Sequence, residues 1–169
     1  YIVYAGTVEP RKNLQTLLEA WESIRRRLGG LTLVIAGRWG WGPGELLKRL
    51  RSAEGVLFTE ELSDAQLKSC ISGAELLVYP SLYEGFGLPP LEAASAGTPS
   101  VISPAKALTE IYGDVATVAR GFDAVSLGEA VLEGLQTESS PSELRDFASA
   151  FSIENMAKNV MQVYGEYSQ

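Results

Sequence analysis

The sequence predicts an α/β protein with a parallel sheet of about six strands and helices on both faces. Strand-like and helix-like segments alternate six times along the 169 residues. The strand segments are continuous apolar runs, which is typical of parallel strands that are buried on both faces. Because crossovers between parallel strands are right-handed, we expect a doubly wound, Rossmann-like sheet with its ligand at the carboxyl ends of the strands.

The elements are expected in regular order along the chain. Strands are expected at residues 1–5, 31–36, 56–59, 74–80, 100–103 and 115–118. Helices are expected at residues 13–28, near 45–53, at 63–72, at 91–96, near 108–112 and at 123–135. Asn13, Ser63 and Asp123 are side chains of the type that caps a helix N-terminus. Gly29 and Gly73 are suited to end the first and third helices.

Length and composition predict a single domain over residues 1–169. Its 46 % hydrophobic and 21 % charged residues are typical of a globular chain that can bury a core. We expect the sheet core in residues 1–136 and C-terminal helices in residues 141–169, including one that Ser152 caps. Met156 is expected on a core face of that last helix. The polar residues 137–141 form the expected linker. Tyr1 already lies in a strand-like run, so we expect a piece of a longer protein.

Several kinds of chemistry are excluded by composition. The chain has no histidine, which removes histidine bases, Ser–His nucleophiles and histidine metal ligands. It has no Asp-x-Asp pair that might hold a divalent ion, so we expect no metal and no cofactor. The single cysteine, Cys70, excludes an internal disulfide and fits a reducing, cytoplasmic compartment. The net charge of −7 argues against nucleic acid as a partner.

The charge is unevenly distributed along the chain. Residues 1–51 hold nine basic and four acidic residues, whereas the remainder holds five basic and 17 acidic. The basic share could serve an anionic ligand, or could hold a longer parent protein at the inner face of a membrane near Arg25–Arg27. The favoured explanation of that run is the C-terminus of a helix, where cations interact well with the macrodipole.

The segment 81–97 predicts an anion site made of backbone. It joins a strand to a helix through Gly85, Phe86, Gly87 and Leu88, and Pro89 and Pro90 can open the helix. Amides at a helix N-terminus lack internal partners and lie at the positive end of the macrodipole. Two glutamates, at positions 84 and 92, bracket this site.

Cations are expected to face the same site. The turn after the first strand runs from Gly6 to Asn13 and contains Arg11 and Lys12. In the usual strand order, strands one and four are neighbours, so both cations can reach the glycine loop. Two cations and a helix terminus could neutralise a departing diphosphate without a metal.

These motifs resemble a known family. Residues 84–92 read EGFGLPPLE, two glutamates separated by seven residues, and residues 97–99 read GTP. The pattern resembles the signature of retaining glycosyltransferases of family 4, and the likeness covers nearly the whole chain. It implies the C-terminal, donor-binding half of a two-domain GT-B enzyme. The turn at 7–13, TVEPRKN, is similar to that of bacterial mannosyltransferases.

The resemblance implies roles for individual residues. It places Lys12 on the diphosphate, and Arg11 substitutes for an arginine that often follows the first glycine, where this chain has Thr7. Glu92 is implied to bind the ribose and Glu84 the donor sugar. The expected donor-binding residues are Gly6, Arg11, Lys12, Leu62, Glu84, Gly85, Phe86, Gly87, Leu88 and Glu92. The residues expected to be catalytic are Glu84, Lys12 and Arg11.

Backbone groups complete the implied site. The amides of Gly85 and Phe86 are implied to contact the sugar, and those of Gly87 and Leu88 the phosphates. Glycine allows the backbone to approach a ligand closely. The backbone near Leu62 is implied to meet the base.

The function expected from the resemblance is transfer of a hexose from a nucleotide diphosphate sugar to a glycan or lipid-linked acceptor, with retained configuration. GDP-mannose is the first expected donor and a UDP-hexose the second. The expected partners are the sugar donor and an N-terminal domain of the same parent chain, without which little transfer is expected. A non-catalytic sugar-nucleotide-binding module of a glycosyltransferase complex is the alternative, and a sugar-nucleotide epimerase would need acids and histidines that are absent.

Overall fold

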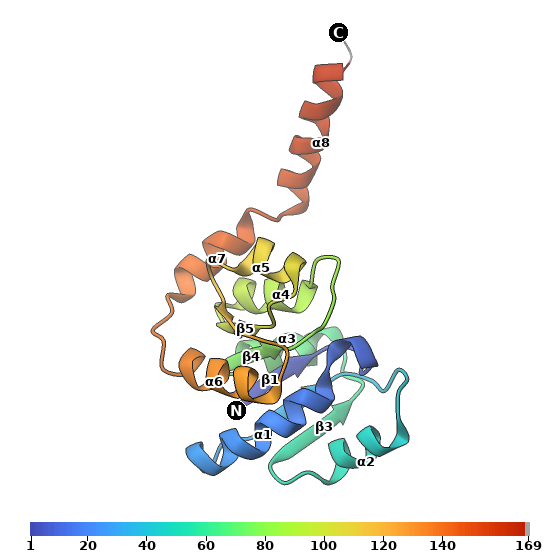
Figure 1. The fold of residues 1–169 in the computed structure, drawn as a ribbon. Helices are drawn as coiled ribbons and strands as arrows, with labels where there is room; N and C mark the ends of the chain where they lie inside the picture. Colours follow the sequence, from blue (N-terminus) through green and yellow to red (C-terminus); the bar gives the residue numbers. More distant parts are fainter. Residues whose placement is uncertain (168–169) are drawn as a thin grey trace.

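The fold is built on one six-stranded sheet (Figure 1). The structure is a computed structural model that describes residues 1–167. The strands are β1 (Ile2–Ala5), β2 (Leu33–Ala36), β3 (Val56–Glu60), β4 (Leu76–Tyr79), β5 (Ser100–Ile102) and β6 (Thr117–Val118). All paired strands are parallel, in the order β3-β2-β1-β4-β5-β6. The predicted doubly wound α/β fold is confirmed, and the chain reverses its winding between β1 and β4, where such sheets bind ligands.

Helices cover the sheet in two groups. They are η1 (Pro10–Lys12), α1 (Leu14–Leu28), α2 (Gly44–Ser52), α3 (Asp64–Ser72), α4 (Leu88–Ala96), α5 (Lys106–Tyr112), α6 (Ala124–Gly134), α7 (Pro141–Ser149) and α8 (Ile153–Tyr167). Helix α1 packs beside α2 and α6, whereas α3 and α7 pack beside α4. Figure 1 shows α1 and α6 on one side of the strands and α4 and α7 on the other.

The core follows from the apolar pattern of the strands and of α1. Every residue of β1, β2 and β4 is buried, as expected for central parallel strands. In α1 the buried residues recur at helical spacing, and Trp21 is the largest of them. Its indole nitrogen donates to the Glu54 carbonyl oxygen at 3.0 Å, which satisfies the polar atom of a buried ring.

The helix ends agree only partly with the sequence signals. The capping box of Ser63 with Gln66 is present, and the Asp123 carboxylate accepts from the first amides of α6. Asn13 occupies the N-cap position of α1 but makes no side-chain cap bond. It adopts a left-handed conformation instead, with φ of 57°, which asparagine tolerates better than most residues. Its Oδ1 accepts from the Thr16 hydroxyl at 2.7 Å.

The C-terminal helices depart from expectation. Helix α7 packs on α4, but α8 projects away from the body of the molecule (Figure 1). We expected Met156 to lie on a core face of the last helix, and this prediction is wrong because its side chain is 61 % exposed. Ile153 and Val160 are also exposed. An amphipathic pattern indicates a helix with an apolar face, but it does not indicate what covers that face.

Two backbones approach closely where β1 and β2 end. The Gly6 amide donates to the Ala36 carbonyl oxygen at 3.0 Å, and Gly6 has a φ of 136°. A Cβ on Gly37 would lie 2.0 Å from the Gly6 carbonyl oxygen, which is far inside van der Waals contact. The turn that carries Gly6 therefore depends on a glycine in the neighbouring strand's loop.

We predict that Gly37→Ala lowers the free energy of unfolding by about 1–3 kcal/mol, because overpacked sites must shift their backbone. Urea unfolding followed by circular dichroism measures this change. Gly44→Ala is the matched control, because a Cβ there meets no heavy atom within 4 Å. Equal unfolding midpoints for the two variants would contradict the close approach.

Candidate functional site

The turn after β1 presents two cations at the carboxyl end of the sheet. It leaves β1 through Gly6, forms η1 and ends at Asn13, whose amide donates to the Pro10 carbonyl oxygen at 3.1 Å. Because η1 ends in Arg11 and Lys12, both side chains are displayed just before α1 begins. The tight turn therefore places the predicted cations at the switch point of the sheet.

The loop after β4 presents the acid and the glycines. Gly87 is the N-cap of α4 and has a φ of 85°, a conformation that favours glycine. Helix α4 then begins at Leu88, earlier than the predicted residue 91. Pro89 and Pro90 occupy its first turn and carry no N–H. Among the first three residues of α4, only Leu88 thus retains an amide donor.

Glu84 joins the loop to the turn. Its Oε1 lies 2.6 Å from the Lys12 Nζ, and its Oε2 lies 2.8 Å from an Arg11 guanidinium nitrogen. The Leu82 amide also donates to the Arg11 carbonyl oxygen at 2.8 Å. The structure thus brings Glu84 together with Arg11 and Lys12, which lie more than 70 positions earlier in the chain.

Tyr79 completes the cluster from the last position of β4. Its hydroxyl accepts from the Lys12 Nζ and donates to the Glu84 carboxylate at 3.1 Å. We did not expect Tyr79 to take part, because an aromatic residue in an apolar strand resembles any core residue. Ser81 lies just beyond it, fully buried, and its carbonyl oxygen accepts from the Ser103 hydroxyl. The one feature of the sequence that could have assigned Tyr79 and Ser81 to the site is their position at the end of a strand, where doubly wound sheets bind ligands.

Electrostatics in the cluster favour one protonation pattern. Burial by itself would raise the pKa of Glu84, but the charge and hydrogen bonds of Lys12 and Arg11 hold that pKa below its usual value of 4.5. Burial and the nearby Glu84 charge raise the pKa of Tyr79, so its hydroxyl keeps its proton at neutral pH. The cluster therefore contains an ionised carboxylate and a neutral phenol.

Glu92 lies outside this cluster. It lies on α4, which packs against α3, and partial burial together with the Asp64 charge raises the pKa of Glu92. Leu62 lies two residues before Asp64, in the loop after β3. In the same loop Glu60 has a φ of 59°, and its carboxylate is 2.7 Å from Arg51. Leu62 therefore directly precedes the N-cap of α3, and Glu92 lies on the helix that packs against α3.

Comparisons with known proteins assign the family. Residues 1–137 match the family model described as glycosyl transferases group 1. The chain belongs to this family. The match confirms the resemblance seen in the sequence, and the chain corresponds to the C-terminal part of the relatives.

Relatives within the glycosyl transferase group 1 family are longer than this chain. O-antigen chain mannosyltransferase B of Escherichia coli is 35 % identical over 175 residues, which span 97 % of this chain and 45 % of that protein. The MMP alpha-(1->4)-mannosyltransferase of Mycolicibacterium hassiacum is 31 % identical, with 96 % of this chain and 42 % of that protein covered. The chain thus spans less than half the length of these curated relatives.

A solved structure shares the fold of this group 1 chain. Anabaena Alr3699/HepE, solved in complex with UDP-glucose, superposes with a TM-score of 0.81 at 17 % identity. The superposition covers 98 % of this chain and 48 % of that one. Like other neighbours of this kind, it places the chain in the GT-B architecture.

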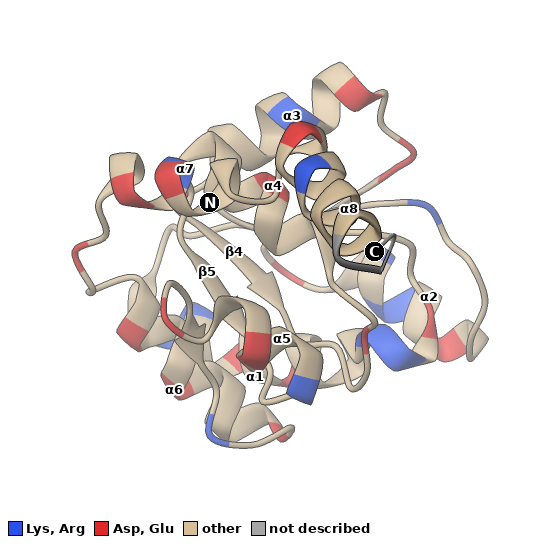
Figure 2. Ribbon diagram, turned by 90° about the horizontal axis from the view of Figure 1, so that it is seen from above, with Lys and Arg blue, Asp and Glu red and all other residues tan. Residues whose placement is uncertain are grey.

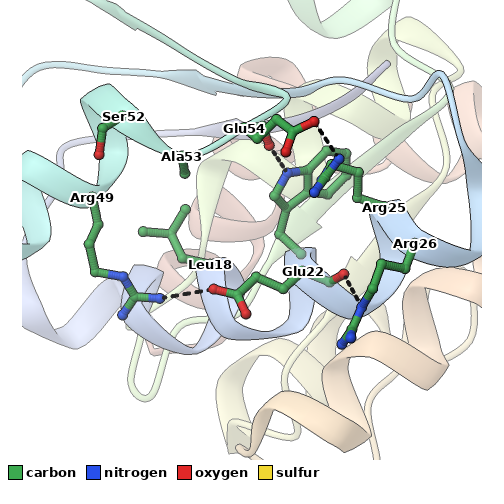
Figure 3. Close-up of a pocket in the computed structure, with 9 residues that line it drawn as sticks. Leu18, Glu22, Arg25, Arg26, Arg49, Ser52, Ala53 and Glu54 are labelled. Atoms are coloured by element: carbon green, nitrogen blue, oxygen red, sulfur yellow. Dashed lines mark hydrogen bonds and ion pairs between the residues drawn. The ribbon is translucent and has the colours of Figure 1, made fainter.

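A pocket of about 430 Å³ lies between α1 and the C-terminal end of α2 (Figure 3). None of its lining residues belongs to the cluster formed by Arg11, Lys12, Tyr79 and Glu84. Two of its three arginines are paired with acids, since Arg25 is 2.7 Å from Glu54 and Arg49 is 3.9 Å from Glu22. The third, Arg26, donates to the Glu22 carbonyl oxygen at 3.1 Å. Figure 2 shows basic positions beside α2, where the N-terminal excess of basic residues gathers. The pocket is lined by the C-terminal end of α2, where a helix leaves carbonyl oxygens rather than amide donors without partners, so it is less suited to an anion than the cluster beside the N-terminus of α4.

Within residues 1–167, no three cysteine or acidic side chains gather as metal ligands would. Over the same residues, no helix has the length and apolar character needed to cross a bilayer.

We predict that Glu84→Gln lowers the free energy of unfolding at neutral pH by about 1–3 kcal/mol, because it leaves buried Lys12 without its anion. A depressed carboxyl pKa stabilises the fold above the usual value of 4.5, and this contribution is lost as the pH falls through the folded-state pKa. The difference in the free energy of unfolding between variant and wild type should therefore become smaller as the pH falls toward about 3.

Urea unfolding at both pH values measures the gap. Glu110→Gln, which removes an exposed carboxylate on α5, is the control. A gap of the same size at neutral and acidic pH would show that the ion pairs of Glu84 do not stabilise the fold.

Proposed function

We propose that this chain is the donor-binding half of a retaining glycosyltransferase that uses a nucleotide diphosphate sugar. One observation carries the proposal: Lys12, Arg11 and Glu84 meet beside the glycine loop, at the switch point between β1 and β4. A diphosphate needs cations and amide donors, and its sugar needs a hydroxyl acceptor such as a carboxylate. All three kinds of group converge there.

The diphosphate is bound by Arg11, Lys12 and the loop amides. Arg11 is the more accessible cation, because its side chain is 46 % exposed whereas that of Lys12 is 8 % exposed. Arg11 also pairs with Glu9 at 2.7 Å, a surface contact that a phosphate can replace. Lys12 contributes a fixed charge close to Glu84, and the amides of Gly87 and Leu88 supply donors that need no proton exchange.

The remaining contacts follow the order of the ligand. Glu84 accepts hydrogen bonds from the sugar hydroxyls and stabilises positive charge at the anomeric carbon, while the amides of Gly85 and Phe86 contact the same sugar. Glu92 accepts from the ribose hydroxyls, and the backbone near Leu62 meets the base. Leu62 directly precedes the N-cap of α3, and α3 packs against α4, which carries Glu92 and begins at the glycine loop. This arrangement supports a continuous path from base to sugar.

The proposed reaction breaks the bond between the anomeric carbon and the diphosphate. Negative charge then grows on the leaving phosphate, where Arg11, Lys12 and the amides stabilise it. The acceptor hydroxyl attacks from the same face, and a phosphate oxygen takes its proton. Retention of configuration agrees with a chain that has no histidine to activate a nucleophile.

Mannose is the proposed sugar, carried as GDP-mannose, because the two relatives described above are mannosyltransferases. A UDP-hexose is the second candidate, since a structural neighbour was solved with UDP-glucose. The acceptor site is proposed to lie in an N-terminal domain of a longer parent chain, as the partial coverage of the relatives supports.

We predict that GDP binds this chain more tightly than UDP. Isothermal titration of the 169-residue chain with both nucleotides measures the difference. Tighter binding of UDP would replace the proposed donor with a UDP-hexose, and absence of binding by both would contradict the whole site.

We predict that Glu92→Gln weakens binding of the preferred nucleotide roughly tenfold, because it removes hydrogen bonds to a charged acceptor. In the wild type the pKa of the Glu92 carboxyl is raised, so its ionisation lowers the free energy of unfolding as the pH rises through that pKa. The Glu92→Gln variant cannot ionise and should therefore unfold no more easily than the wild type. Glu129→Gln on α6 is the control. A less stable Glu92 variant with unchanged affinity would assign Glu92 a structural role.

We predict that nucleotide affinity is the same with EDTA and with magnesium, because cations and amides replace the metal. Titrations of the preferred nucleotide diphosphate in both buffers compare the two affinities. A more than tenfold gain with magnesium would contradict the metal-independent site and would leave the donor assignment intact.

A further inference from the structure

Tyr112 is a buried phenol beneath the glycine loop that the proposed function does not use. It is the last residue of α5 and is 1 % exposed. Its hydroxyl donates to the Gly87 carbonyl oxygen at 2.7 Å. The bond therefore runs from the core to the peptide group that precedes α4.

This bond fixes the direction of one amide. No cis peptide bond occurs within residues 1–167, so the carbonyl of Gly87 and the N–H of Leu88 point in opposite directions across one planar peptide group. Because the Gly87 carbonyl oxygen points to Tyr112, the Leu88 N–H points away from Tyr112. Pro89 and Pro90 have no N–H, so this amide is the single donor among the first three residues of α4.

The peptide group has little freedom to turn. Gly87 has a φ of 85°, and a Cβ there would lie 2.6 Å from a Leu108 methyl carbon. The loop is thus pressed against α5 on the side opposite the solvent. Rotation of the Gly87–Leu88 peptide would break the bond to Tyr112 and leave a buried hydroxyl unpaired, which is costly.

The ring of Tyr112 is itself held in place. It packs edge-on against Phe86 with centroids 6.1 Å apart, and it is tilted against Phe147 at 6.0 Å. Phe151 packs on both of those rings, at 5.7 and 5.2 Å. The phenol keeps its proton at neutral pH, because burial and the Glu92 charge raise the pKa of Tyr112.

We propose that Tyr112 is a positioning residue of the donor site, whose hydroxyl orients the Leu88 amide for the diphosphate of the nucleotide sugar. This inference rests on the proposed function. The role is indirect, because Tyr112 acts through the Gly87–Leu88 peptide and contacts no part of the donor. Its effect is therefore confined to the diphosphate and does not extend to the base or the ribose.

The test compares Tyr112→Phe with wild type. NMR titrations, which follow weak binding, measure the affinities for the preferred nucleoside diphosphate and for the corresponding nucleoside. We expect the variant to bind the diphosphate about three- to tenfold more weakly, the range for loss of one hydrogen bond. The nucleoside affinity should not change.

Tyr1→Phe is the matched control. It removes a tyrosine hydroxyl that also donates to a backbone carbonyl oxygen, that of Cys70, at 2.8 Å. Tyr1 precedes β1, at the end of the strand opposite the donor site. Equal losses of diphosphate affinity in both variants would show a general effect of stability and overturn the inference.

The outcomes separate the inference from the proposed function. If wild type binds neither GDP nor UDP, the proposed function fails. If wild type binds and Tyr112→Phe binds the diphosphate equally well, only the inference fails. Parallel weakening of nucleoside and diphosphate in Tyr112→Phe would also overturn it, because the hydroxyl would then support the whole loop.

Discussion

The contact of Glu84 with Lys12 and Arg11 is the interaction on which the site depends. Neither the turn after β1 nor the loop after β4 has regular structure long enough to hold itself in place, and the carboxylate joins them through both of its oxygens. Lys12 can be buried because an ionised partner lies 2.6 Å away, since a buried charge without such a partner would be strongly unfavourable. The same contact keeps the Glu84 carboxylate ionised and oriented, which is the state that a sugar hydroxyl requires.

Because the charges of the side chains in this cluster are balanced, the proposed binding of an anion depends strongly on the backbone amides beside them. Arg11 and Lys12 are matched by Glu84 and Glu9, so the four side chains carry no net charge among them. A nucleoside diphosphate adds two or more negative charges at about the same place. The amides at the start of α4 are donors whatever the side chains pair with, and their direction is set by the fold. This is why the orientation of the Leu88 peptide matters although it carries no formal charge.

The fold, and the meeting of Arg11, Lys12 and Glu84 at a strand end, could be predicted from the sequence more completely than the other contacts of that cluster. Apolar runs, glycines and the capping box of Ser63 were sufficient to place the strands and helices along the chain, and the usual order of doubly wound sheets made strands one and four neighbours. The spacing of Glu84 and Glu92 marked the loop. Tyr79 and Tyr112 were not foreseen, because a buried phenol and a buried phenylalanine follow the same pattern until the hydroxyl's partner is known. Two local signals were also misread. Asn13 starts α1 through its left-handed backbone conformation and not through a side-chain cap bond, and the apolar residues of α8 are exposed although their spacing suggested a buried face.

The exposure of individual site residues limits how this chain can bind its ligand. Glu92 is exposed and Arg11 is nearly half exposed, so water has access to the ribose and diphosphate parts of the proposed donor path. A ligand there gains little from burial of apolar surface, and its affinity must come from a few directed hydrogen bonds and charges. Such bonds are sensitive to direction as well as distance. A peptide held by a buried hydroxyl therefore has more influence on binding in this open site than it would have in a closed, largely apolar pocket.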